Sequence, residues 1–155
     1  MEPTVLSLLT DTKYHNFALH ITGYGSGGSI ASISLPYWYN SLKEKKLRNK
    51  MQVFMYSSPR PGSLEYSKYL ETLKVPLVRY AKKGDIVPHV PDQSMGYSHA
   101  GLEFYDVSLP FIRKNLVRCS ATRVEDNKCS LRDQIFIPTN HITPFQKPIP
   151  LPPYC

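Results

Sequence analysis

A glycine-rich turn is the part of this sequence that comes closest to a catalytic motif. Residues 23–27 read Gly-Tyr-Gly-Ser-Gly and follow an apolar run. This is the form of a nucleophile elbow, in which a strained strand-to-helix turn presents the serine of a G-x-S-x-G pattern. Gly25 stands at the position of that serine. Because glycine tolerates the positive φ of such a turn, the backbone can be kept while the nucleophile is lost.

Ser26 is the nearest hydroxyl to the missing nucleophile. An elbow directs this next side chain elsewhere, and its backbone N–H would donate to an oxyanion. An acyl-enzyme requires a hydroxyl within hydrogen-bond reach of a histidine, so Ser26 could serve only if the turn slipped by one residue. Two interpretations follow: a domain that has lost ester hydrolysis, which we favour, or an active carboxylic ester hydrolase that uses Ser26.

Alternating strand-like and helix-like runs predict that this turn belongs to a parallel α/β sheet. The apolar residues 17–22 predict a strand buried on both faces. Residues 27–45 predict the following helix, broken or kinked at Pro36, with Gly23, Gly27 and Gly28 letting strand and helix pass closely. The other predicted elements are helices at 4–12 and 63–73, the latter capped by Ser63, strands at 52–57 and 76–81, and an antiparallel pair at 102–107 and 116–120.

Several short motifs follow one another along nearly the whole chain. They are residues 21–31, 56–62, 84–91, 97–104 and 140–142. These segments resemble, in the same order, the T-G-H-S-L-G-G-A, G-S/G-P-R-V-G, R-D-I-V-P-H-L-P, F-L-H-x-G-x-E-x-W and D-H-L motifs of the fungal class 3 triacylglycerol lipases of the Rhizomucor and Rhizopus type. The resemblance implies a three-layer, α/β-hydrolase-like fold with a mostly parallel sheet, and serine carboxylic ester hydrolysis as the activity of the family.

The same resemblance assigns roles to the other candidate site residues. Asp85 follows a predicted strand, at the sheet edge where α/β sites are built, and matches the acid of a catalytic triad. His141 matches the base that the acid orients. Asn140 departs from the family, which has aspartate before this histidine, and so alters the local electrostatics. His89 and His99 lie in shared motifs but are expected to be structural.

Three cysteines leave the pairing open on the sequence alone. Cys119 and Cys129 bracket a polar segment and are either bridged or free thiols. The resemblance favours the bridge, which would close a short loop and contribute roughly 2–3 kcal/mol. In the family a C-terminal cysteine pairs with one near the N-terminus, and Cys155 has no such partner here.

Composition and charge exclude several classes of protein. The 155 residues carry a formal charge of +7, much of it within residues 43–50, which is typical of a solvated helix end. Attraction to an anionic membrane is a minor alternative. There is no nucleic-acid motif, no cofactor or metal motif, and no apolar run long enough to span a bilayer. The family and the cysteines indicate secretion, whereas the lack of a signal peptide after Met1 indicates an intracellular chain.

We expect residues 1–143 to be a partial lipase-type domain and residues 144–155 a proline-rich irregular tail. The family has a lid, an oxyanion residue and further strands before the elbow, and this sequence does not encode them. A bare apolar sheet edge would result, to be covered by an N-terminal segment or a protein partner. Lipid or ester ligands and a lipid interface are the expected partners; a non-catalytic lipid- or protein-binding pseudoenzyme and a fragment without function are the alternatives.

Overall fold

The computed structural model describes residues 2–11, 13–14, 17–44, 50–108, 115–120 and 125–142. The predicted tail at 144–155, Cys155 and most of the basic run lie outside these residues. The elements are α1 (Glu2–Thr10), β1 (Leu19–Tyr24), α2 (Ser26–Glu44), β2 (Met51–Tyr56), β3 (Gly62–Ser63), α3 (Leu64–Thr72), β4 (Leu77–Lys82), η2 (Val87–His89), η3 (Gln93–Met95), β5 (Tyr97–Ser98), β6 (Leu102–Asp106), β7 (Leu116–Arg118), η4 (Ser130–Arg132) and α4 (Thr139–Ile142).

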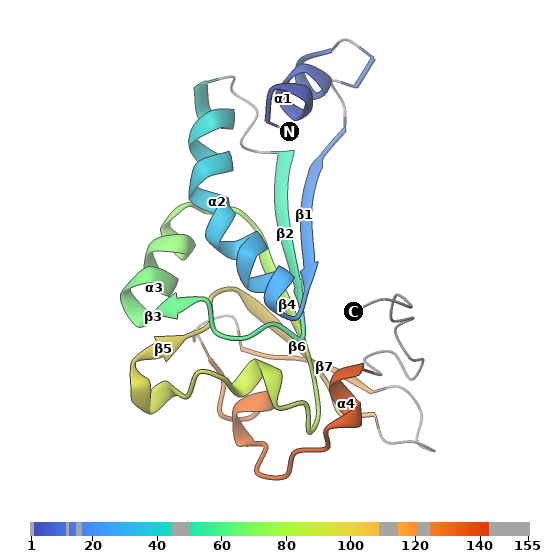
Figure 1. Ribbon diagram of the computed structural model, residues 1–155, viewed down its shortest axis with the longest axis vertical. Coiled ribbons are helices and arrows are strands. Elements are labelled where there is room, and N and C mark those ends of the chain that lie inside the picture. Colours follow the sequence, from blue (N-terminus) through green and yellow to red (C-terminus); the bar gives the residue numbers. More distant parts are fainter. Residues whose placement is uncertain are drawn as a thin grey trace, which may run out of the picture.

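A five-stranded, mostly parallel sheet organises the chain, in the order β1-β2-β4-β6-β7 (Figure 1). β1, β2, β4 and β6 are parallel to one another, and β7 closes the sheet antiparallel to β6. A short antiparallel pair, β3 with β5, lies apart from it. The predicted α/β class, the three adjacent parallel strands and the closing antiparallel pair are therefore confirmed.

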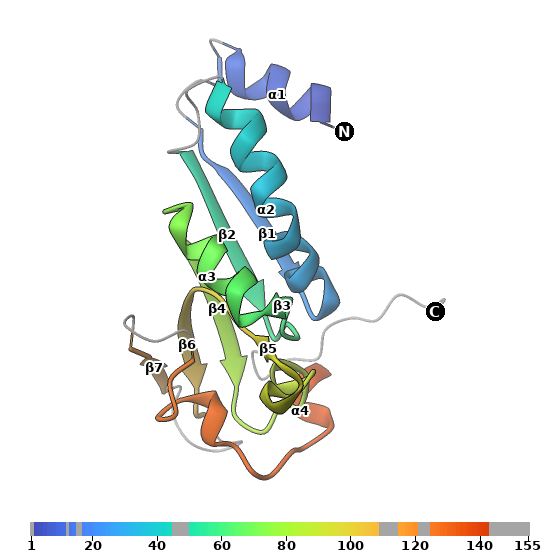
Figure 2. The same ribbon diagram turned by 90° about the vertical axis from the view of Figure 1, so that its left-hand side faces the viewer.

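The helices α2 and α3 lie on the same side of the sheet in both views (Figures 1 and 2). The main core forms between them and the sheet, where Leu35 and Leu42 of α2, Val53 of β2 and Leu70 of α3 are fully buried. Because α2 keeps this contact on both sides of Pro36, the predicted break at that proline does not occur. Ser63 caps α3 as predicted, since its hydroxyl accepts the Tyr66 N–H.

Strand β1 is not buried on both faces, contrary to the expectation from its apolar run. Its half-buried side chains alternate with the exposed His20 and Thr22. α2 covers only one face, and β1 is an edge strand among the described residues. On the open face the ring of His20 packs against Phe54 of β2, with ring centroids 5.6 Å apart.

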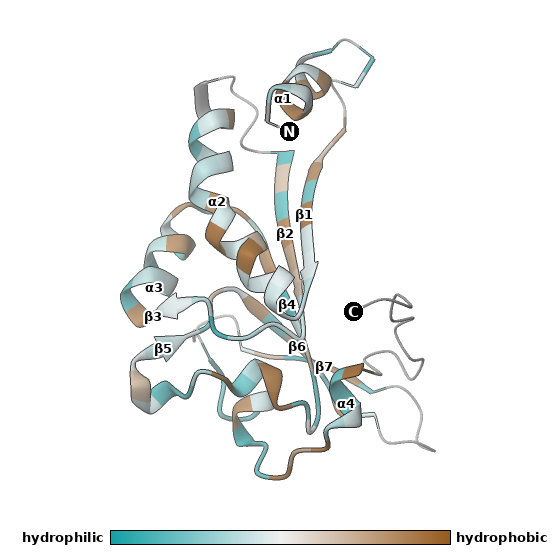
Figure 3. Cartoon of the chain, in the orientation of Figure 1, coloured by the Kyte–Doolittle hydropathy of each residue, from teal (hydrophilic) through white to brown (hydrophobic). Residues whose placement is uncertain are grey.

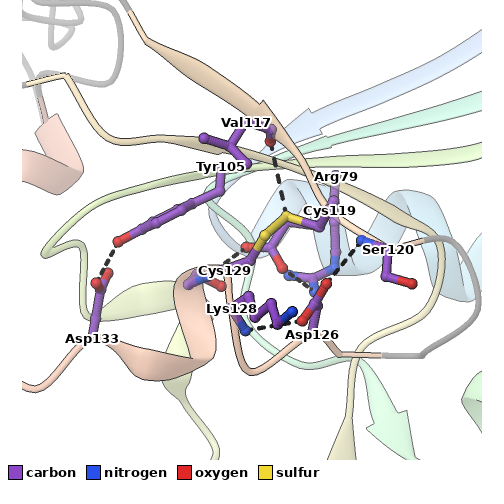
Figure 4. The surroundings of a disulfide bond; sticks show 11 residues. Arg79, Tyr105, Val117, Cys119, Ser120, Asp126, Lys128, Cys129 and Asp133 are labelled. Carbon is purple, nitrogen blue, oxygen red and sulfur yellow. Dashed lines mark hydrogen bonds and ion pairs between the residues drawn. A yellow bond between two sulfur atoms is a disulfide. The ribbon is translucent and has the colours of Figure 1, made fainter.

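The predicted bridge between Cys119 and Cys129 is present (Figure 4). It joins the residue after β7 to the residue before η4, so it ties the antiparallel end of the sheet to the segment that leads toward α4. The Asp126 carboxylate supports the intervening loop by accepting the N–H groups of Ser120 and Lys128, each at 2.9 Å. Nearby, the Tyr105 phenol donates to Asp133.

Candidate active site

The turn between β1 and α2 is made by Gly25 alone, with φ +55°. Its N–H donates to the Tyr56 carbonyl at 2.9 Å, which fixes the turn to the end of β2. A Cβ on Gly23 would lie 2.1 Å from the Gly27 carbonyl oxygen, and one on Gly28 would lie 2.6 Å from Ser58 Cβ. The close passage predicted for Gly23 and Gly28 is confirmed, whereas a side chain at Gly27 would enter open space in the described structure.

The missing side chain of Gly25 would point directly at a histidine. An ideal Cβ on this residue would lie 3.5 Å from His141 Nε2 and 3.7 Å from Cε1. A serine at this position would carry its Oγ one bond beyond Cβ. That bond is enough to bring the hydroxyl within hydrogen-bond distance of Nε2. Ser26, in contrast, is the exposed first residue of α2. The turn thus aims position 25, and not position 26, at the imidazole.

The other ring nitrogen of His141 faces Asp85. The distances from Nδ1 to the two carboxylate oxygens are 3.1 and 3.2 Å. The Asp85 side chain is fully buried while that of His141 is 26% exposed. Asp85 lies just beyond β4, and its carboxylate also accepts the Val87 N–H at 3.0 Å. The structure therefore brings together Asp85, His141 and Gly25, and a carboxylate in this place fixes the imidazole with Nε2 toward the turn.

Asn140, the departure from the family pattern, anchors the short helix that carries His141. Its amide donates to the Lys83 carbonyl at 2.8 Å, two residues before Asp85. Gly84 makes room for this contact with φ +74°, because a Cβ there would lie 3.1 Å from the amide nitrogen. An ionised aspartate could not donate this hydrogen bond. Asn140 therefore links α4 to the Asp85 loop through a hydrogen bond that an ionised aspartate would not make.

His89 and Arg60 hold the loop that carries Asp85 in place. The His89 ring lies between two carbonyl oxygens, of Asp85 and of Ser130, each at 2.8 Å. Arg60 donates to the His89 carbonyl and, at 2.7 Å, to that of Pro91. These contacts fit the structural role predicted for His89. They also give Arg60 a role that sequence analysis did not assign.

A buried ion pair completes the support of this loop. Arg60 makes two hydrogen bonds of 2.9 Å with the Glu125 carboxylate, and both side chains are at most 5% exposed. Burial on its own would raise the pKa of Glu125, but the Arg60 hydrogen bonds, together with neighbouring positive charge and the His99 N–H, hold this pKa at about 2. The Glu125 carboxylate is therefore ionised wherever the chain is folded at ordinary pH.

His99 is buried beneath the same loop, as expected for a structural histidine. Its Nε2 is 2.8 Å from the Pro88 carbonyl, and Nδ1 has no hydrogen-bond partner among the described residues. Burial, reinforced by the charge of Arg79, lowers the pKa of His99 to about 3. Arg79 pairs with Glu103 at 2.6 Å. Glu103 also lies within 4.8 Å of Cys119 and Cys129, whose sulfurs bond to each other and so are not free thiolates.

Acidification from pH 6.5 to pH 5 should destabilise the chain through His99. The unfolded state binds a proton near pH 6.5 and the folded state only near pH 3, so stability is full above pH 6.5 and falls as the pH drops. The expected loss is about 2 kcal/mol of unfolding free energy over this interval. Urea unfolding at both pH values measures it. His99→Gln should flatten the dependence and His20→Gln, at an exposed site on β1, should not; an equal slope in all three proteins would refute the assignment.

Tyr24 is a further residue of the site that sequence analysis passed over. It directly precedes Gly25, and its ring packs against the His141 ring with centroids 5.0 Å apart. Its phenol donates to the main-chain carbonyl of His141. The only available signal was its place inside the glycine-rich turn. That signal does not reveal a contact with a residue more than a hundred positions away.

Comparison with known proteins identifies lipases that are similar to this chain. The family model described as Lipase (class 3) matches residues 1–95. The chain is 30% identical to the lipase of Rhizopus niveus over 135 residues, which cover 86% of this chain and 31% of that protein. It is 33% identical over 85 residues to a secreted mono- and diacylglycerol lipase of Malassezia globosa, covering 54% of this chain and 26% of the relative.

A solved structure extends the likeness to three dimensions. The lipase of Rhizopus microsporus var. chinensis superimposes with a TM-score of 0.79 at 27% identity, covering 95% of this chain and 49% of that one. The chain spans about a third of the length of the Rhizopus niveus relative. Within the described residues, none of the helices is both long and apolar enough to cross a membrane.

Proposed function

The chain belongs to the class 3 lipase family, and from this premise we propose that it is a lipase-like domain impaired in ester hydrolysis. One observation carries the proposal: Gly25 occupies the position whose side chain would face His141 Nε2 at 3.5 Å. In a serine hydrolase this histidine takes the proton of the hydroxyl that attacks the ester carbonyl. Glycine offers no atom to attack or to be deprotonated.

Asp85 and His141 keep the arrangement of an acid and a base in this proposal. The buried carboxylate of Asp85 would hold the proton on His141 Nδ1, which leaves Nε2 as an acceptor toward Gly25. The Ser26 N–H, at the start of α2, is the candidate oxyanion donor. Loss of one member of such a triad lowers turnover by about a millionfold in a well-studied protease, which sets the scale of the expected impairment.

A lipid or ester ligand is the substrate class that the surroundings of the site favour. Exposed isoleucines flank the site residues in the chain, with Ile86 next to Asp85 and Ile142 next to His141. Ile135 is 78% exposed in the apolar segment that leads to α4 (Figure 3). Apolar side chains around a polar centre suit a molecule with one polar group and acyl chains. A non-catalytic lipid binder is the corresponding physiological role.

Hydrolysis of a short-chain p-nitrophenyl ester by the natural chain should not exceed the buffer rate. The reason is the absence of a hydroxyl at position 25, facing His141. The release of p-nitrophenol is followed with matched amounts of the natural chain, Ser26→Ala and His141→Gln. All three should be indistinguishable. Activity in the natural chain that is lost in both variants would instead establish the alternative, an active ester hydrolase that uses Ser26 with His141 and Asp85.

Binding of a lipid ligand is measured separately from hydrolysis. The natural chain should bind a non-hydrolysable ether analogue of a monoacylglycerol, measured by calorimetry, and the substitution Ile135→Ser should weaken the binding. Leu64→Ser removes an exposed apolar side chain from the start of α3 and serves as the control. No heat of binding with any of the three proteins would leave the impairment intact but remove lipid as the ligand class.

A further inference from the structure

Tyr24 touches His141 in two different ways, and neither contact belongs to the acid–base pair itself. Its phenol donates to the main-chain carbonyl oxygen of His141. Its ring also lies against the imidazole, with ring centroids 5.0 Å apart and planes inclined by 35°. One side chain therefore restrains both the backbone and the ring of the same histidine.

The restraint on the backbone matters because α4 is only four residues long. The last carbonyls of a helix have no partner within the helix, and so short a helix has little stability of its own. The Asn140 amide joins α4 to the Lys83 carbonyl. The Tyr24 phenol supplies a partner for the carbonyl of the next residue, His141. Together the two contacts hold His141 between the Asp85 loop and the turn at Gly25.

The restraint on the ring acts on the direction of Nε2. A histidine held only through Nδ1 can still tilt about that hydrogen bond. The Tyr24 ring blocks this movement on one face, and the Tyr24 backbone leads directly into Gly25. Tyr24, which packs on the imidazole, is thus covalently joined to Gly25, which the imidazole faces. The peptide bond between them limits how the two residues can move relative to each other.

We infer that Tyr24 is a positioning residue for His141, holding Nε2 on the turn at position 25 through its ring and its phenol. The inference rests on the proposed role of Asp85 and His141 as an acid–base pair. It deepens that proposal by naming what keeps the pair aimed at the vacant nucleophile position.

The chemistry of the phenol suits this role. Burial, opposed by the neighbouring Ser57 hydroxyl and assisted by the charge of Asp85, raises the pKa of Tyr24 to about 12. The phenol therefore keeps its proton at neutral pH. It can then go on donating to the main-chain carbonyl of His141.

Nuclear magnetic resonance of the histidine side chains tests the inference in the natural chain. The His141 Nδ1 proton, held by Asp85, should give a resolved signal that disappears in His141→Gln. Tyr24→Phe keeps the ring and removes the donor, and Tyr24→Leu removes both contacts. We expect the signal to broaden in Tyr24→Phe and to be lost in Tyr24→Leu. Tyr69→Phe makes the same chemical change on the exposed surface of α3 and should leave the signal unchanged.

A rate measurement gives the second readout. In a chain that also carries Gly25→Ser, labelling by a fluorophosphonate should slow by about tenfold with Tyr24→Phe and by about a hundredfold with Tyr24→Leu, as expected for a misaimed base. Tyr69→Phe should not change the rate. These losses should exceed anything explained by unfolding, which the thermal midpoint of each variant monitors; Tyr24→Phe suffices if Tyr24→Leu does not fold.

The outcomes separate this inference from the proposed function. A natural chain in which Asp85 does not hold the His141 Nδ1 proton would contradict both the proposed acid–base pair and the role of Tyr24. A held proton that persists unchanged in folded Tyr24→Phe and Tyr24→Leu, with unchanged labelling rates, would contradict only the role of Tyr24.

Discussion

A serine introduced at position 25 should react covalently with a fluorophosphonate, whereas the natural chain should not. The Cβ of that serine would lie 3.5 Å from His141 Nε2, so its hydroxyl can reach the imidazole that Asp85 orients. A positioned general base contributes roughly 10²- to 10⁴-fold to such a reaction. We expect Gly25→Ser to label faster than Gly25→Ser combined with His141→Gln by a factor in this range, measured by mass spectrometry of the intact chain over time.

The controls for this experiment separate the contribution of the base, His141, from the effect of backbone strain at position 25. Gly25→Ala carries no hydroxyl at position 25 and should not be labelled there. Gly25→Ser and Gly25→Ala both place a Cβ at φ +55°, at a cost of about 1–3 kcal/mol, and should therefore lose stability together. Ester turnover by Gly25→Ser should rise much less than labelling, because turnover also requires oxyanion donors beyond the Ser26 N–H. Equal labelling of Gly25→Ser with and without His141→Gln would refute the preorganised base.

Removal of the Arg60 guanidinium should cause the largest loss of stability among the substitutions considered. Arg60→Met leaves the Glu125 carboxylate buried without its bidentate partner and leaves the carbonyls of His89 and Pro91 without their donor. Breaking a buried pair in this way typically costs about 3–5 kcal/mol. Urea unfolding at pH 7 measures the change in unfolding free energy.

Two further variants test the cause of that loss. Arg118→Met removes an exposed arginine from β7 and should change stability by no more than about 0.5 kcal/mol. Arg60→Met combined with Glu125→Leu should recover part of the loss, because no uncompensated charge remains buried. If Arg60→Met is no more destabilising than Arg118→Met, the ion pair does not support the Asp85 loop.

Local patterns predicted those features of the fold that depend on near neighbours in the sequence. The Ser63 cap depends on a residue three positions away, and the alternation of strand and helix runs required parallel neighbours. The meeting of Asp85 and His141 was expected from the order of motifs, and it places both at the carboxyl edge of the sheet. The bridge between Cys119 and Cys129 was expected from the resemblance alone.

Features that depend on distant neighbours could not be predicted in the same way. The alternation in β1 shows which side chains share a face, but not that only one face is covered. Arg60 and Glu125 lie 65 positions apart, and the sequence around either residue does not predict its contact with the other. The helix at Pro36 continues because its packing on the sheet outweighs one lost hydrogen bond. The contacts of Tyr24 likewise exist only in three dimensions.

The parallel pairing of β1, β2 and β4 has a consequence for cooperativity. Parallel neighbours cannot be joined by a tight turn. Each pair of strands therefore forms only when the crossover segment that connects them is complete. Gly25 follows β1, Asp85 follows β4 and His141 lies beyond the disulfide loop. The shortest contiguous segment that contains all three is residues 25–141, which includes β2, β4, β6 and β7. The site therefore forms only when the whole sheet has folded. Its geometry depends on global folding, and no subdomain can form it alone.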